Sequence, residues 1–564
     1  MSNRKIVIDP ITRIEGHLRI EVEIDENNVI REAWASGQLF RGIETILQGR
    51  DPRDAGLIAQ RICGVCTNVH YRASISAVEE AYGITIPHNA EIIRNLVTLS
   101  LFVQDHIVHY YHLHSLDYVD ITGALNADCL KASLEAQKWS ANPYRNSVAH
   151  LESVKEKLSS YVKAGRLGLF ANGYWGHEMY KLSPEQNLIH MNHYLEALNI
   201  QRDISKAIAI FAGKTPHPQN LVVGGVTSVA EILNPQRLND FLFIIKDVRG
   251  FIERAYVPDM MMIVDAYRET ITSGEGRASG NFMGCGGYRF GKQSVLFESG
   301  VIKGHDFGNI APFDAAKITE EASRSWYENN EPLSPYEGET TPFYTDLNED
   351  GTLKSEGKYS WVKAPRYDGE VMEVGPLARM IIGYSKNSPV IRPYMERFMK
   401  STQMELIDFS TTIGRNAARA VEAQICCDYL FDMMSDLIEN VKYFDETTWT
   451  KYSFEEMPHE AKGAGIFEVP RGVLGHFIRI EDAKIANYQA VVPTTWNASP
   501  KDSANRRGAY EESLIGITLS NPEQPLEVLR TVHSFDPCLA CAVHVIDATG
   551  RELSEYKLIS SNTF

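Results

Sequence analysis

The sequence predicts a mainly α-helical protein with an α+β, multi-domain organisation, built on a central bundle of long helices. Helical periodicity is sustained over three long stretches, and strand-like alternation occurs near both ends of the chain. The length of 564 residues is well above the usual size of one domain. Because the strand-like alternation lies near both ends of the chain, small antiparallel sheets are expected there. They would carry the candidate N- and C-terminal metal-binding motifs.

Residues 1–50 are expected to form the N-terminal sheet. Polar and apolar residues alternate in three runs, Lys5–Asp9, His17–Asp25 and Val29–Ala35. Asn27 and Asn28 supply a turn signal between the last two runs. This pattern favours a small antiparallel sheet.

The predicted helical core has a first part, residues 51–270, and a second part, residues 371–462. Asp51 is a candidate N-cap with Pro52 in the first turn, and Ser183 is another, followed by Pro184. Helices of the length seen here normally pack against each other in a bundle. The three long stretches are Ala90–Leu116, Pro184–Phe211 and Leu406–Val441.

The other segments have different compositions. Residues 271–370 are rich in Gly, Ser, Pro, Asn and Tyr, which predicts loops and short strands that cover the bundle. Residues 463–544 return to short strands, such as Phe477–Glu481 and Tyr488–Val492. Residues 545–564 form a C-terminal extension beyond the last motif.

The composition excludes several classes of function. The formal net charge of −17 and the pI near 5.5 argue against nucleic acid as a partner, because its phosphates would be repelled. The sequence contains no run of 18 apolar residues that would predict a membrane span, and its first residues contain no secretory signal. Export or membrane attachment is therefore expected to come through a partner.

Eight cysteines in a chain of this length do not indicate a disulfide scaffold. Four form two Cys-x-x-Cys pairs, Cys63/Cys66 near the start and Cys538/Cys541 near the end. The other four are expected to be buried, inert thiols, since such cysteines pack as small hydrophobic residues. They are Cys129, Cys285, Cys426 and Cys427.

Two such pairs predict a four-sulfur metal site. Cysteines at positions i and i+3 can direct both sulfurs to one point, and two facing pairs suit zinc, iron or nickel. The long sequence gap adds only about 0.6 kcal/mol per doubling of loop length, against about 10–16 kcal/mol for metal binding at small structural sites. A structural zinc site, a dithiol redox site and a catalytic metal centre remain open on this evidence.

The residues around the pairs favour the catalytic interpretation. His70 and His544 follow the second cysteine of each pair, and Asp536-Pro537 precedes Cys538. Acid, base and thiolate groups together are what proton-coupled electron chemistry requires.

At this point the chain resembles the large, catalytic subunit of nickel–iron hydrogenases, especially the uptake type that oxidises hydrogen outside the cytoplasm. The matching motifs occur in order over essentially the whole chain. They are Asp9-Pro-Ile-Thr-Arg-Ile-Glu15-Gly-His-Leu, Phe40-Arg-Gly-Ile-Glu44, Arg61-x-Cys-Gly-x-Cys-x-x-x-His70, Gln104-Asp105-His-Ile-Val-His, Ala171-Asn-Gly-Tyr-Trp-Gly-His, Val469-Pro-Arg471-Gly, Val491-Val-Pro-Thr-Thr-Trp and Asp536-Pro-Cys-x-x-Cys-x-x-His544.

The resemblance implies reversible heterolytic oxidation of H2 to two protons and two electrons at nickel and iron, the iron carrying one carbon monoxide and two cyanides. It makes Cys63 and Cys538 the terminal nickel ligands and Cys66 and Cys541 the bridging ligands. It also makes Glu15 the acceptor of a proton from Cys538. A partly buried carboxyl suits this role because desolvation raises its pKa. Without the resemblance, an ion pair between Glu15 and Arg13 is the simpler interpretation.

The resemblance further places Arg471 over the metals, with Asp105 and Asp536 as its carboxylate neighbours. A structural ion-pair cluster is the alternative for these three. Thr494 stands where serine is common in the family, and its hydroxyl can donate to a cyanide. His70 matches a donor to the sulfur of Cys541.

Glu44, His544 and the backbone carbonyl of Ala490 match a magnesium site beside the centre, although histidine is an uncommon magnesium ligand. In the family, a dedicated maturation endopeptidase removes a C-terminal extension after nickel is inserted. Residues 545–564 are therefore expected to be cleaved, so that the mature chain ends at His544.

The resemblance also implies partners. Electrons must leave through an iron–sulfur small subunit, because the chain has no further cysteine clusters. That subunit is expected to bring the export signal, so that the folded complex reaches the periplasm, with a cytochrome or quinone-linked partner at the membrane. The rival interpretations are a non-catalytic, quinone-site relative from respiratory complexes and a four-cysteine zinc protein.

Overall fold

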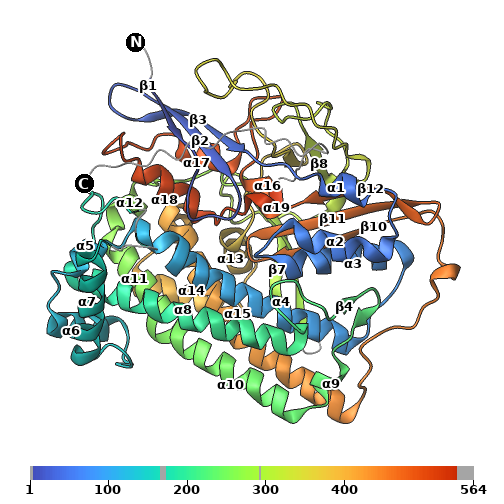
Figure 1. The fold of residues 1–564 in the computed structure, drawn as a ribbon, viewed down its shortest axis with the longest axis horizontal. Helices are drawn as coiled ribbons and strands as arrows, with labels where there is room; N and C mark the ends of the chain where they lie inside the picture. The colour runs from blue at the N-terminus through green and yellow to red at the C-terminus, as the bar shows by residue number, and fades with distance from the viewer. Residues whose placement is uncertain (1–3, 166–169, 171–172, 291–293, 543–564) are drawn as a thin grey trace.

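The computed structural model describes residues 4–165, 170, 173–290 and 294–542, the side chains of residues 230, 541 and 542 excepted. The described chain is mainly helical, with small antiparallel sheets at its periphery (Figure 1). The predicted combination of helices and small antiparallel sheets is confirmed.

The three predicted long helices are present and contact one another or a shared neighbour. α4 packs against both α15 and α8, and α10 packs against both α8 and α15. Their apolar faces belong to the largest group of buried side chains in the described chain. The three predicted helices are α4 (His88–Val108), α8 (Pro184–Ala212) and α15 (Thr412–Tyr443), and the fourth helix, α10, spans Pro235–Phe251.

Local capping explains where two of them begin. The Ser183 hydroxyl accepts from the Gln186 N–H, and the Gln186 side chain accepts from the Ser183 N–H, so the predicted cap of α8 is a complete capping box. The predicted helix Leu406–Val441 begins later than expected. Residues Leu406–Ser410 form a 3₁₀ turn, and the Thr411 side chain caps α15.

The helix predicted over Ala90–Leu116 changes geometry part-way. α4 ends at Val108 and continues as a π-helical turn, His109–His114, and then a 3₁₀ turn, Ser115–Asp117. A π turn widens the helix by one residue per turn and is frequent at functional sites. The residues of this turn lie beside the candidate site described below.

The N-terminal sheet contains the three predicted strands in the order β1-β2-β3, all antiparallel. Buried side chains of β2 and β3 form a second core with α17 (Ala509–Leu514) and α18 (Leu526–Ser534), which come from the C-terminal part of the chain. The strands are β1 (Arg4–Ile8), β2 (Leu18–Ile24) and β3 (Ile30–Gly37). This sheet therefore brings the two ends of the sequence together.

A C-terminal sheet, in the order β10-β11-β12, packs against α3 (Thr67–Tyr82). Gly463 and Gly465 of β10 permit the close approach, since a Cβ atom on Gly465 would lie 1.9 Å from the carbonyl oxygen of Ala73. The strands are β10 (Ala461–Val469), β11 (Gly472–Glu481) and β12 (Lys484–Val491).

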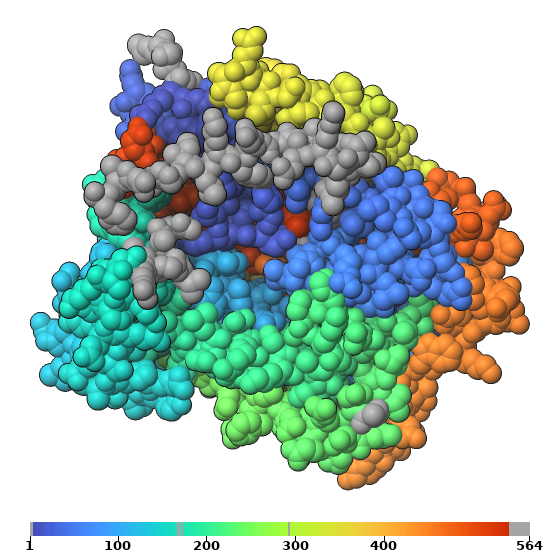
Figure 2. Space-filling view, in the orientation of Figure 1, coloured from blue at the N-terminus to red at the C-terminus, as the bar shows by residue number. Residues whose placement is uncertain are grey.

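The predicted covering segment consists of loops with two antiparallel strand pairs. Figure 2 shows much of it, in yellow, as a layer along the top of the molecule. The paired antiparallel strands β6 (Phe282–Phe290) and β7 (Ser294–Ile302) are each longer than the short strands expected there. β8 (Ile318–Glu321) pairs with β9 (Ala364–Tyr367).

The prediction that the sheets carry both cysteine pairs is wrong. Cys66 is the N-cap of α3, and Cys538 immediately precedes α19 (Leu539–Ala542). A helix start leaves backbone N–H groups directed outward, which suits thiolates better than a saturated strand ladder does. The motifs therefore lie at loop-to-helix junctions.

The remaining helices and the smallest strand pair complete the described chain. Among the described residues, no helix is long and apolar enough to cross a membrane. These elements are α1 (Ile43–Leu47), α2 (Ala55–Ala59), α5 (Ile121–Ala124), α6 (Cys129–Trp139), α7 (Val148–Lys163), α9 (Val229–Ile232), α11 (Val257–Ala266), α12 (Arg268–Thr272), α13 (Pro376–Ser385), α14 (Arg392–Thr402), α16 (Pro493–Asn497), β4 (Leu221–Val222) and β5 (Gly225–Val226).

Candidate metal centre

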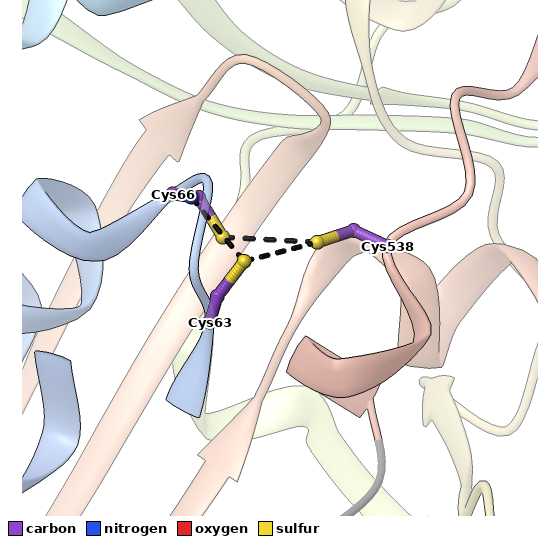
Figure 3. Close-up of side chains that lie close together, drawn as sticks. All are labelled: Cys63, Cys66 and Cys538. Carbon is purple, nitrogen blue, oxygen red and sulfur yellow. Dashed lines mark hydrogen bonds between the residues drawn. The ribbon is translucent and has the colours of Figure 1, made fainter. Parts of the chain in front are cut away.

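Three of the four predicted cysteine ligands converge in the interior (Figure 3). The Sγ atom of Cys538 lies 3.4 Å from that of Cys63 and 3.8 Å from that of Cys66. Sulfurs that bind one metal ion tetrahedrally at about 2.3 Å lie about 3.8 Å apart, so the spacing matches a shared metal and is too long for a disulfide. All three residues are buried.

The first pair lies on a tight turn between a 3₁₀ turn and α3. Cys63 is extended, and its sulfur accepts from the backbone N–H groups of Val65 and Cys66 at 3.2 and 3.3 Å. Those donors and the start of α3 favour the thiolate form, which is the form that binds metals.

The second pair is held by the N-terminal segment. Glu15 donates its N–H to the Pro537 carbonyl at 3.3 Å and accepts from the Leu539 N–H at 2.7 Å, forming a parallel bridge around Cys538. Gly16 follows with a φ of 86°, and a Cβ atom there would lie 2.5 Å from the Ala540 nitrogen. Only glycine fits this contact without strain.

Two predicted ligands cannot be placed. Cys541 belongs to α19, but its side chain lies outside the described residues, as does all of His544. The fourth sulfur and the histidine ligand therefore remain predictions from the sequence.

Glu15 reaches the centre from the edge of the N-terminal sheet. Its Oε2 atom lies 3.3 Å from the sulfur of Cys538 and accepts from the Ala540 N–H at 2.9 Å. Burial, followed by the charge of Cys63, raises the pKa of Glu15 to about 7. Arg13 instead pairs with Asp117, so the alternative ion pair between Glu15 and Arg13 is absent from the described contacts.

Arg471 lies beside the sulfurs and is paired with both predicted carboxylates. Its Nη1 donates to Asp105 and its Nη2 to Asp536, each at 3.0 Å, and its Nε donates to the Asp536 carbonyl at 3.1 Å. Burial alone would lower the pKa of Arg471, but Asp536 and the nearby thiolates outweigh it and hold that pKa above its usual range. The guanidinium is therefore a fixed positive charge.

Unlike Arg471, Asp105 does not carry a fixed charge. Burial raises its pKa to about 7, although Arg471 opposes the shift. The pair thus consists of a permanent cation and a carboxylate that ionises near neutrality.

His70 and Thr494 line a small cavity of about 10 Å³ together with Cys66, Arg471 and Cys538. The Thr494 hydroxyl accepts from the Cys538 N–H at 3.2 Å. Burial lowers the pKa of His70 to about 4, so its imidazole is neutral.

A second cavity, of about 20 Å³, contains Glu44 and Ala490. The Glu44 carboxylate accepts from the Ala490 N–H at 2.9 Å and from the Thr340 hydroxyl, and the Lys363 ammonium lies 3.5 Å away. Burial raises the pKa of Glu320, on the same cavity wall, to about 7. The space holds about one water molecule or small ion.

Comparisons with known proteins identify the family. The family model described as nickel-dependent hydrogenase matches residues 41–544, and a HoxL-like model matches residues 5–35. The chain belongs to the nickel-dependent hydrogenase family.

Its relatives are large subunits. The large chain of the quinone-reactive Ni/Fe-hydrogenase of Wolinella succinogenes is 47% identical, over 98% of each chain. The uptake hydrogenase large subunit of Rhizobium leguminosarum is 44% identical, over 99% of this chain and 98% of the relative. The Ni-Fe-Se hydrogenase of Desulfovibrio vulgaris Hildenborough superposes with a TM-score of 0.78 and 34% identity, covering 96% of this chain and all of that one.

The described residues fit the nickel and iron of this hydrogenase family. Three thiolates converge at metal-binding spacing, backbone N–H groups stabilise the Cys63 sulfur, and a buried cation balances the charge. Iron and nickel both accept soft thiolate ligands.

The sequence prediction missed one residue that joins both halves of the hydrogenase site. Arg41 donates to the carbonyls of Arg61 and Ile62, next to Cys63, and to the Ala540 carbonyl at 3.2 Å. Arg41 lies in the Phe40–Glu44 motif that carried the resemblance. The sequence therefore shows the residue but not the backbone carbonyls that it contacts. The four other cysteines form no disulfide within the described chain, and burial raises the pKa of the Cys426 and Cys427 thiols.

Proposed function

We propose that this large subunit catalyses the reversible heterolytic oxidation of H2 to two protons and two electrons. The observation that carries the proposal is the convergence of three cysteine sulfurs with the Glu15 carboxyl against one of them. Bound nickel and iron, the latter with carbon monoxide and cyanide ligands, would supply the splitting of H2. Cys63, Cys66, Cys538 and Cys541 would hold these metals through their thiolates.

Glu15 moves protons in this proposal. Its carboxyl oxygen lies 3.3 Å from the Cys538 sulfur, within reach of a proton held there. Because the pKa of Glu15 is near 7, its carboxyl can both accept and release a proton at neutral pH with little cost in free energy. The Ala540 N–H holds the accepting oxygen in place.

Arg471 supplies a fixed charge at the cavity, and Asp105 and Asp536 hold its plane. A guanidinium is suited to this because it stays protonated and bonds several acceptors at once. Thr494 would direct a hydroxyl at a cyanide, and His70 would donate to the Cys541 sulfur. The long helices α4, α8, α10 and α15 would form the bundle that supports this cavity.

Magnesium is proposed for the second cavity, with Glu44, the Ala490 carbonyl and His544 as ligands. Support comes from the Glu44 carboxylate and the room for one small ion. Lys363 already neutralises part of that carboxylate, so an incoming cation would have to displace its contact.

An iron–sulfur small subunit is the proposed electron acceptor. Apart from the centre, no group of cysteines within the described residues could hold a second metal cluster. The Wolinella relative is named quinone-reactive, which supports a quinone-linked acceptor. A cytochrome at the membrane is proposed as the intermediary. Periplasmic export of the folded pair, through a signal on the small subunit, completes this part of the proposal.

Maturation is proposed to involve an endopeptidase that cleaves after His544. The end of the matched hydrogenase family region at residue 544 supports this position. An intact mass that still contained residues 545–564 in fully active enzyme would contradict it.

Metal analysis combined with infrared spectroscopy tests the proposed function. Purified enzyme should contain nickel and iron and show metal-bound carbonyl and cyanide bands. A protein with zinc and without nickel would support the zinc-scaffold alternative, and one with neither metal would support the non-catalytic quinone-site relative. Glu15→Gln should retain the metals and lower H2/D2O exchange to a measurable residual rate, whereas full exchange would remove Glu15 from the mechanism.

A further inference from the structure

His533, on α18, has an acceptor beside each of its two ring nitrogens. Its Nε2 lies 2.8 Å from the Thr12 carbonyl oxygen, and its Nδ1 lies 2.6 Å from a carboxylate oxygen of Asp117. The ring is 1% exposed, so solvent does not mediate these contacts.

The two contacts place hydrogen-bond acceptors on opposite sides of the His533 ring. A carbonyl oxygen only accepts, so Nε2 must carry a proton. Burial alone would raise the pKa of Asp117, but Arg13 and His533 outweigh it and hold that pKa well below its usual range. An ionised carboxylate also only accepts, so Asp117 offers a second acceptor, on the Nδ1 side of the ring.

His533 connects the segments that build the centre. Thr12 and Arg13 lie just before Glu15, and Arg13 also donates to the Leu113 carbonyl at 2.7 Å. The backbone carbonyl of His533 accepts from His109 Nε2 at 2.7 Å, on the π turn after α4. His533 thereby contacts the N-terminal loop and the π turn while standing five residues before Cys538.

We propose that His533 is a positioning residue, which holds the Thr12–Arg13 segment so that the Glu15 carboxyl stays against the Cys538 sulfur. The inference rests on the proposed proton role of Glu15. Arg13 has a φ of 56°, a left-handed conformation that non-glycine residues adopt only when their surroundings enforce it. The bonds to Asp117, Leu113 and, through Thr12, to His533 supply that enforcement.

Within the part of the chain that the structure describes, few charged groups face this ring. Asp117 is the only carboxylate among the described side chains that bond to it. Burial lowers the pKa of His109 and of His114, whose ring centre lies 5.7 Å away, so both stay neutral. Arg530, on the same helix, donates to the Asp117 carbonyl at 2.7 Å rather than to its carboxylate.

The test is His533→Gln in the complete heterodimer. One amide nitrogen cannot donate to acceptors on opposite sides of the ring, so one contact is lost. We expect unchanged nickel content and infrared bands but H2/D2O exchange lowered by about 10- to 100-fold, as for a misplacement of about 1 Å. His150→Gln is the matched control, because His150 makes one hydrogen bond, to Asn192, on the distant α7.

A double variant separates positioning from a general structural role. If His533 acts through Glu15, then adding His533→Gln to Glu15→Gln lowers exchange no further. A further loss in the double variant, or wild-type exchange in His533→Gln alone, overturns the inference while leaving the function of Glu15 intact. Wild-type exchange in Glu15→Gln alone refutes the proposed proton role instead.

The variant could also fail to retain its metals. In that case Asp117→Asn, which preserves side-chain volume, replaces it. Retained nickel with lowered exchange in Asp117→Asn supports the positioning role. Loss of nickel in both variants shows that His533 and Asp117 hold the metal site itself and not the Glu15 carboxyl. That result overturns the inference.

Discussion

Gly465→Ala should damage the centre from a distance, because the contact between β10 and α3 leaves no room for a side chain. The added Cβ atom would lie 1.9 Å from the Ala73 carbonyl oxygen and 2.9 Å from the Ala77 nitrogen. Both are backbone atoms of α3, so no rotamer change can relieve the overlap. The sheet and the helix must separate.

The size of the shift follows from these distances. Cβ atoms essentially never approach closer than 3.0 Å, so the oxygen contact must open from 1.9 Å by about 1 Å. Overpacking of this kind costs about 1–3 kcal/mol of stability. Because α3 begins at Thr67, directly after Cys66, and contains His70, a movement of about 1 Å should lower turnover by about 100-fold.

Hydrogen-dependent dye reduction and nickel content per chain provide the assay. Gly250→Ala is the control, since nothing lies within 4 Å of the Cβ position on α10 and alanine favours a helix. Gly463→Ala, whose Cβ would lie 2.3 Å from the Ala77 carbonyl, should behave like Gly465→Ala. Wild-type activity in both β10 variants would refute the view that this contact positions α3.

Three further outcomes are expected. Cys538→Ser should abolish nickel retention, measured by mass spectrometry, because the Cys538 sulfur lies within 3.8 Å of both other sulfurs; retained nickel would exclude it as a ligand. Arg471→Lys should destabilise the chain by about 3–5 kcal/mol in denaturant unfolding, since an ammonium cannot replace the bonds to both Asp105 and Asp536, and an unchanged midpoint would contradict this. Burial raises the pKa of Glu511 from 4.5 to about 7, so the folded chain binds this proton more tightly and loses about 3 kcal/mol of stability as pH rises between those values. Glu511→Gln should lack that part of the loss, and an identical pH dependence of thermal unfolding would refute the assignment.

The elements that the sequence predicted best are those with strong local signals. The Ser183 capping box and sustained apolar periodicity define α8 to within one residue at its end. The strand pattern of Lys5–Asp9 differs from β1 by one residue at each end. In both cases the predictive signal comes from residues of one element, whose side chains interact with neighbours in the same helix or strand.

The candidate site was predictable only as a set of residue types. Motif order identified the cysteines, Glu15 and Arg471, but not the helix starts that hold the sulfurs. Arg41 was missed because its partners are backbone carbonyls, which carry no sequence identity. His533 was missed because its partners, the Thr12 carbonyl and the Asp117 carboxylate, lie far away in the sequence. The bond from His533 to Thr12 spans 521 positions, and no local pattern encodes it.

The interlocked ends of the chain constrain how the centre assembles. Cys63 and Cys538 are 475 positions apart, and the Cys538 segment is fixed by backbone bonds to Glu15 and by the Arg41 side chain. Each of these contacts requires that the N-terminal sheet and the C-terminal helices have already docked. The first pair, by contrast, is organised by its own turn and by α3. The Cys63–Cys66 turn therefore does not depend on the docking of the two chain segments. The complete group of three sulfurs, with Arg471 and Glu15 beside it, exists only after the C-terminal segment closes over it.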